Sequence, residues 1–72
     1  MVAPSVDRLT EGAKVTLAYE HRYRVVEIIR GPWQSSEGNW LVTAIDEDRI
    51  TDTDPGIRSF RIDRIQNEVH PV

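Results

Sequence analysis

Apolar and polar residues alternate along most of the chain beyond residue 13, with the period that is typical of β-strands. The alternation predicts four strands and a short fifth one, at residues 14–20, 23–30, 40–45, 57–62 and 68–70. The second run is apolar on both faces, with Arg24 on the same face as Val26 and Ile28, as expected of a bent strand in a small barrel. A curled meander leaves fewer exposed edges than an open sheet, so we expect a mainly β fold, a five-stranded antiparallel β-barrel.

The connections between these strands carry turn and loop residues, at residues 21–22, 31–39, 46–56 and 63–66. Residues 1–8 are expected to form a tail and a short N-terminal helical turn, with Ser5 as its cap. In the last connection, Asp63 and Arg64 are expected to have a structural role in the turn. We therefore expect one β-barrel domain at residues 9–72, preceded by this short segment.

Composition and charge narrow the possible functions. The 72 residues include no cysteine, which excludes disulfides, thiolate metal sites and a cysteine nucleophile. The net charge of -3 argues against a protein that coats nucleic acid through its overall charge. No apolar stretch is long enough to span a membrane and no signal peptide is evident, so we expect a cytoplasmic protein with no membrane partner.

Neither catalysis nor metal binding has a recognisable motif. His21 and His70 are far apart, and neither has a nucleophile or an orienting carboxylate at a characteristic spacing. The acidic loop at residues 46–54 lacks the glycine and the final glutamate of a calcium-binding loop, so it is interpreted as a solvated loop. We therefore expect a protein that is not an enzyme and that has no cofactor and no bound metal.

Arginine is concentrated in one short segment of this otherwise acidic chain, where Arg58, Arg61 and Arg64 lie within seven positions. A guanidinium group can bind a phosphate or a carboxylate through two parallel hydrogen bonds. These arginines could therefore bind a phosphate of a ligand. Alternatively, they could pair with nearby acids such as Asp63 and Glu27.

Aromatic residues can complement such arginines, because bases of a single strand stack on aromatic rings. Most of the aromatic residues are expected in the core, with Tyr19 on an apolar strand face and Trp40 at a strand start. Trp33 is expected in a loop and is therefore the aromatic residue most exposed to a ligand.

Two segments resemble the WYL domain family. Residues 58–65, Arg-Ser-Phe-Arg-Ile-Asp-Arg-Ile, are similar almost residue for residue to the strand and turn that are typical of this family. Residues 38–46 resemble the segment that gives the family its name and keep Trp40. Leu41 and Ile45 stand there at positions where a tyrosine and an aromatic residue are usual. The resemblance extends over nearly the whole chain.

This resemblance implies an Sm-like, Src-homology-3-type β-barrel that binds nucleic acids or nucleotides and is usually part of bacterial transcription regulators. Carried over by position, the ligand-binding residues are Arg58 and Arg61, with Arg24 on the second strand. Trp33 or Tyr19 would stack on a base. Because the chain begins with its own methionine and the barrel accounts for its length, we expect a stand-alone domain from a bacterium or a bacteriophage.

Two functional hypotheses follow. The first is a non-enzymatic module that binds single-stranded nucleic acid or a nucleotide, in transcription regulation or in the interplay of phage and host. The alternative is a protein interaction module that engages a host protein through a sheet edge or through the acidic loop. A homo-oligomer formed through edge strands is compatible with either hypothesis.

Overall fold

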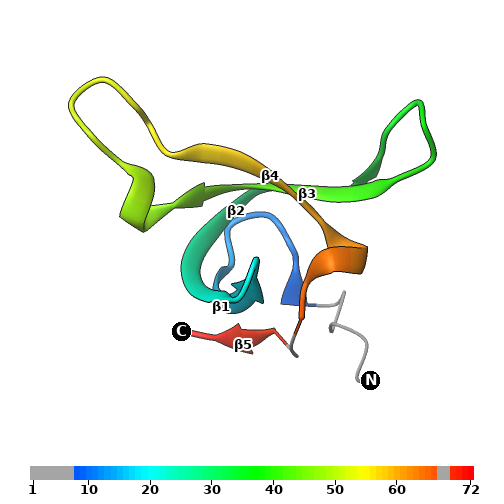
Figure 1. The fold of residues 1–72 in the computed structure, drawn as a ribbon, viewed down its shortest axis with the longest axis horizontal. Coiled ribbons are helices and arrows are strands. Elements are labelled where there is room, and N and C mark those ends of the chain that lie inside the picture. The colour runs from blue at the N-terminus through cyan, green and yellow to red at the C-terminus, as the bar shows by residue number, and fades with distance from the viewer. Residues whose placement is uncertain (1–7, 67–68) are drawn as a thin grey trace.

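The computed structural model describes residues 8–66 and 69–72, which form a mainly β fold (Figure 1). The strands are β1 (Lys14–Tyr19), β2 (Arg22–Gln34), β3 (Trp40–Asp46), β4 (Ile57–Arg61) and β5 (His70–Pro71). Two 3₁₀ turns, η2 (Glu47–Arg49) and η3 (Ile62–Arg64), follow β3 and β4. Residues 1–7 of the predicted N-terminal segment, including the predicted cap Ser5, lie outside the described residues, as does Glu68 of the predicted fifth strand.

The strands pair antiparallel in the order β4-β3-β2-β1-β5. The first four strands form the body of the sheet, and the two residues of β5 pair with Val15 and Thr16 on the other edge of β1. No described residue pairs β4 with β5. One isolated antiparallel bridge, between Tyr19 and Ile65, lies on the same edge of β1 as the pairing with β5. The prediction of a mainly β, antiparallel fold is confirmed, whereas the closed five-stranded barrel is not, because this sheet stays open.

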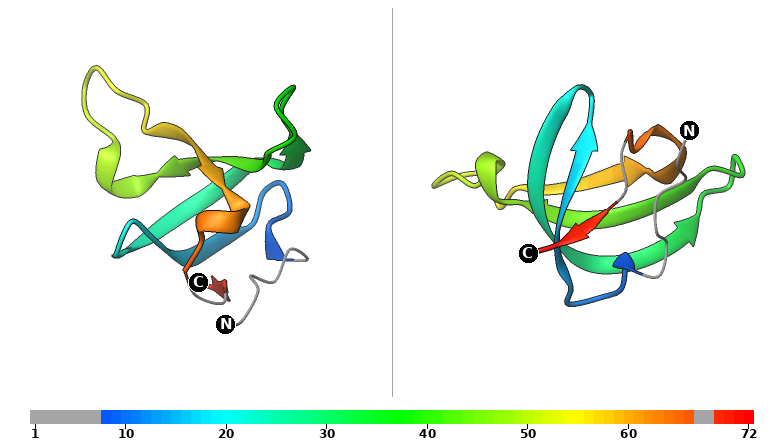
Figure 2. Two further views of the ribbon diagram at one scale, coloured as in Figure 1. Left: turned by 45° about the vertical axis from the view of Figure 1, so that its right-hand side comes forward. Right: turned by 90° about the horizontal axis from the view of Figure 1, so that it is seen from below.

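The long strand β2 joins the two halves of the fold. Its first half pairs with β1 and its second half with β3, and Figure 2 shows the curved ribbon that results. The register shifts between Ile28 and Arg30 and again between Arg30 and Trp33, and such irregularities increase the bend of a strand. The bent second strand is therefore confirmed in outline.

The predicted end of this strand at Arg30 was wrong, because β2 continues through Gly31, Pro32 and Trp33 to Gln34. Pro32 is tolerated since it lies in an irregular stretch of the pairing with β3. Gly31 is required by packing, because a Cβ atom there would lie 2.8 Å from the backbone oxygen of Leu9. Trp33 is thus a strand residue and not the loop residue that the sequence suggested.

The connection between β1 and β2 consists of Glu20 and His21, one residue earlier than predicted. Both residues have positive φ angles, 53° and 62°. Since Tyr19 and Arg22 are register partners, this is a two-residue hairpin loop of the kind that the twist of paired strands favours.

The core is formed by the buried side chains of the strands and of the segments that flank them, and it contains residues that the alternation predicted to be buried. Tyr19 and Phe60 meet edge to face there, with ring centroids 5.0 Å apart. The buried cluster is formed by Leu9, Val15, Leu17, Tyr19, Val26, Ile28, Val42, Ala44, Phe60, Ile65 and Val69. Trp40 is 52% exposed, contrary to its predicted place in the core, because it stands at the first position of β3, beyond the packed part of that strand.

No helix in the described part of the chain is long and apolar enough to cross a membrane. Within residues 8–66 and 69–72, no group of three or more histidine, aspartate or glutamate side chains is placed to hold a metal ion.

Candidate functional site

The two arginines of β4 lie on opposite faces of the sheet. Arg58 is opposite the buried Ala44 and shares its face with Phe60, whereas Arg61 is opposite Leu41 on the other face. This separation follows from the period of two along a strand, because residues three positions apart point to opposite sides. Arg58 and Arg61 therefore do not form one basic site.

Arg58 is engaged by the loop that precedes β4. Its Nη2 donates to Asp54 Oδ2 at 2.8 Å, and its Nη1 donates to the backbone oxygen of Ile57 at 2.8 Å. Asp54 Oδ1 accepts from the backbone N–H of Gly56 at 2.8 Å. The hydrogen bond from Arg58, helped by that of Gly56, lowers the pKa of Asp54. Arg58 thus stabilises the end of the loop.

Arg24 and Tyr19 are engaged inside the protein. Arg24 is 5% exposed, and its Nη1 donates to Asp46 Oδ2 at 2.9 Å. The Arg24 guanidinium lies 6.0 Å from the ring centroid of Tyr19 and 5.9 Å from that of Phe60. These two predicted ligand residues therefore belong to a buried cluster.

Across the face turned away from the core, a chain of hydrogen bonds joins three strands. Trp33 Nε1 on β2 donates to Thr43 Oγ1 on β3 at 3.1 Å, and Thr43 Oγ1 lies 3.0 Å from Ser59 Oγ on β4. Because an indole N–H can only donate, Thr43 Oγ1 accepts a hydrogen bond from it, and the Thr43 hydroxyl can in turn donate a hydrogen bond to Ser59 Oγ. The hydroxyl proton of the exposed Ser59 is then free for an acceptor in solution.

Arg30 lies on the same face and completes the row. It is the register partner of Thr43, and its guanidinium carbon lies 4.5 Å from the centroid of the Trp33 ring. No carboxylate of residues 8–66 and 69–72 forms an ion pair with Arg30. Arg30 was not among the residues predicted from the sequence, because the loop predicted from Gly31 separated it from Trp33.

Arg61 lies in the neighbouring row. Trp33 is opposite Leu41, and Leu41 is opposite Arg61, so the three residues cross β2, β3 and β4 side by side. Two strand spacings separate the backbones of β2 and β4 by about 10 Å. We use the term outer face for the surface formed by Arg30, Trp33, Leu41, Thr43, Ser59 and Arg61. Of the predicted ligand residues, Trp33 and Arg61 lie on it.

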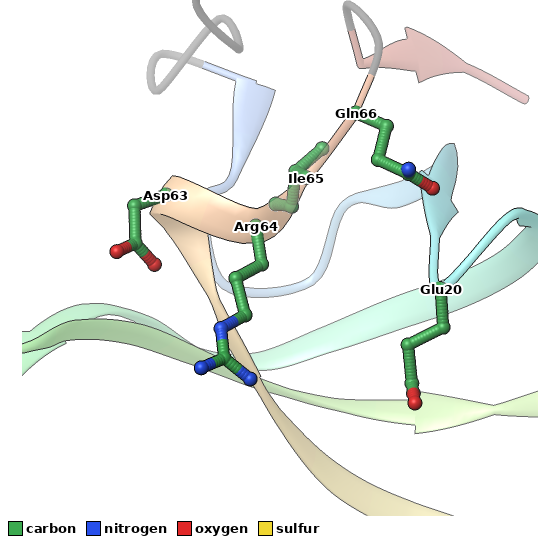
Figure 3. A pocket seen from close by; sticks show the side chains of 5 residues that line it. All are labelled: Glu20, Asp63, Arg64, Ile65 and Gln66. Carbon is green, nitrogen blue, oxygen red and sulfur yellow. The ribbon is translucent and has the colours of Figure 1, made fainter.

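A separate hollow of about 500 Å³ opens beside η3 (Figure 3). It is lined by Glu20, Asp63, Arg64, Ile65 and Gln66. Gln66 Oε1 accepts from the backbone N–H of His21 at 2.6 Å, which ties this segment to the β1–β2 turn. Asp63 and Arg64 lie in η3, where a structural turn was predicted. The hollow is open, and its lining includes the carboxylates of Glu20 and Asp63 as well as the guanidinium of Arg64. Its charge is therefore mixed, so it favours ligands of one charge less clearly than the outer face does.

Comparisons of the chain with protein-family models, with curated proteins and with solved structures gave no match.

Proposed function

We propose that this protein is a non-enzymatic, WYL-like module that binds single-stranded nucleic acid on its outer face. The observation that carries the proposal is the stacking of Arg30 on Trp33, in a row beside Arg61. An arginine that covers an aromatic ring and has no carboxylate partner among the described residues can bind a phosphate while the aromatic and apolar surface contacts a base. The acidic net charge confines such binding to a small area.

We also propose that the fold is related to the Sm-like β-barrel that the resemblance implies. The antiparallel order β4-β3-β2-β1-β5 and the bent β2 support this relationship. The Tyr19–Ile65 bridge lies where a closed barrel would continue its pairing. A role in transcription regulation or in the interplay of phage and host would then follow from binding a nucleic acid rather than from catalysis.

Fluorescence anisotropy with a labelled single-stranded oligothymidine of about ten nucleotides, at low salt, tests the function. We expect Arg30→Ala to weaken binding about tenfold, which corresponds to the loss of one charge-assisted hydrogen bond to a phosphate. Arg49→Ala removes an equal charge from η2, outside the outer face, and is the matched control. The proposal fails if the wild-type protein does not bind, or if the two variants bind equally.

The edge of β4 supports the alternative of a protein partner. Ile57, which is 46% exposed, lies on the edge strand opposite Ile45. An extended segment of another protein could add to such an edge. This alternative requires a partner that stays bound after nuclease treatment and is lost with Ile57→Lys. Capture of nucleic acid alone would eliminate it.

A further inference from the structure

Arg61 on the outer face holds a carboxylate of its own chain. Arg61 Nε donates to Asp63 Oδ1 at 3.1 Å, and Arg61 Nη2 donates to Asp63 Oδ2 at 2.8 Å. This is the two-bond arrangement in which a guanidinium group also binds phosphate. A phosphate that approaches Arg61 therefore finds these two donors already occupied.

We propose that Asp63 is an internal competitor for the phosphate at Arg61, an inference that rests on the proposed function. The Asp63 side chain is 63% exposed, and the hydrogen bonds of its carboxylate in the described part of the chain all come from Arg61. An exposed pair of this kind contributes little to stability, so a phosphate can displace the carboxylate at small cost. The Asp63 carboxylate then turns into solvent.

The competition divides the outer face into two parts. Arg30 has no such carboxylate and is ready to bind, whereas Arg61 becomes available only when Asp63 leaves. In the view of Figure 3, the Arg64 side chain lies between those of Asp63 and Glu20. Asp63 thus lowers the affinity of the outer face without contacting Arg30 or Trp33, and it restricts tight binding to ligands that reach both arginines.

The chain provides a matched control for this inference. Asp54 holds Arg58 as Asp63 holds Arg61, with a distance of 2.8 Å between Oδ2 and Nη2 in both pairs. Asp54→Asn and Asp63→Asn change the net charge equally. Arg58, however, lies on the opposite face of β4, so that Asp63→Asn alone frees an arginine on the outer face.

The experiment compares the two variants in the anisotropy assay with the single-stranded oligothymidine, after circular dichroism has shown that both are folded. We expect Asp63→Asn to bind roughly two- to fivefold more tightly than the wild type, and Asp54→Asn to gain less. In the Arg61→Ala background, Asp63→Asn should give no gain, which a double-mutant cycle measures directly.

Three results would overturn the inference while the proposed function stands. These are wild-type binding that Asp63→Asn leaves unchanged, an equal gain from Asp54→Asn, and a gain that persists in the Arg61→Ala background. Absence of oligothymidine binding by both the wild type and Asp63→Asn would overturn the proposed function and this inference together. Binding by Asp63→Asn alone would support the competition by Asp63 but would overturn the proposed function of the wild-type protein.

Discussion

Arg24 and Asp46 form a buried ion pair whose side chains are 6% and 1% exposed. Asp46 Oδ1 also accepts from the backbone N–H of Asp48, at 3.1 Å, so the carboxylate is held from two sides. Removal of Asp46 leaves the buried Arg24 guanidinium with one remaining carboxylate partner among the described residues, the 71% exposed Glu20, whose Oε1 lies 3.5 Å from Arg24 Nη2. We expect Asp46→Ala to lower the free energy of unfolding by about 3–5 kcal/mol, measured by urea denaturation.

The double variant Arg24→Met, Asp46→Leu is the informative control for this pair. It removes both charges and keeps apolar volume between Tyr19 and Phe60, so we expect a smaller loss than from Asp46→Ala alone. An equal or larger loss in the double variant would contradict the view that the cost arises from a buried charge that has lost its buried partner.

The pair of Asp54 and Arg58 makes a contribution to folding stability that depends on pH. The hydrogen bond from Arg58 lowers the pKa of Asp54, so the folded value lies below the unfolded value of about 3.9. The pair therefore stabilises the fold above that pH, and its contribution is lost as the pH falls through the lowered value. We expect Arg58→Met to raise the pKa of Asp54 toward its ordinary value in an NMR titration. Arg61→Met should leave it unchanged, and an equal shift would contradict the assignment.

The faces of single residues could be predicted from the sequence, but not their partners. The period of two placed Arg24 on the face of Val26 and Ile28, which is the core face. Its partner Asp46 is 22 residues away, and nothing in the alternation links the two. The same period separates Arg58 from Arg61, although the resemblance had grouped them as ligand residues.

At the level of elements, the β1–β2 turn carries a strained backbone. His21 has a φ of 62°, a conformation that costs a residue with a side chain about 1–2 kcal/mol and that glycine adopts freely. We expect His21→Gly to raise the free energy of unfolding by about 0.5–1 kcal/mol in urea denaturation, since the backbone N–H that Gln66 accepts from is kept. His70→Gly in β5 should be destabilising. A loss with His21→Gly would show that the ring contact with Gln66 Nε2 at 3.3 Å outweighs the strain.

The strands were predictable where one face is buried, and less so where the backbone bends. β1, β3 and β4 alternate regularly, and their predicted bounds differ from the observed ones by one residue at most. The end of β2 was missed because Gly31 and Pro32 are typical of loops. Their places in the strand depend instead on the close approach of the Leu9 backbone to Gly31 and on the irregular pairing of β2 with β3. Both are tertiary contacts.

At the level of the whole molecule, the side chain of Tyr19 contacts the edge strand β4, on the side where the sheet stays open. Tyr19 Oη accepts from the backbone N–H of Arg61 at 3.4 Å, so a side chain from β1 occupies a donor on the open edge of β4. Tyr19 also forms the bridge to Ile65. The strand count was predictable from the alternation, but a closed ring of strands requires edge pairing that local patterns do not specify.

The small area of the outer face predicts a shallow salt dependence. Each phosphate of a single strand that an arginine neutralises contributes about -0.7 to the slope of log K against log salt concentration. With Arg30 and Arg61 as the two contacts, we expect a slope between about -0.7 and -1.4 in anisotropy titrations at several salt concentrations. Arg30→Ala should reduce the slope by about 0.7, and Arg49→Ala should leave it unchanged. A much steeper slope would mean that further cations contact the nucleic acid. That result would be at odds with a chain of net charge -3 whose Arg24 and Arg58 are already held by Asp46 and Asp54.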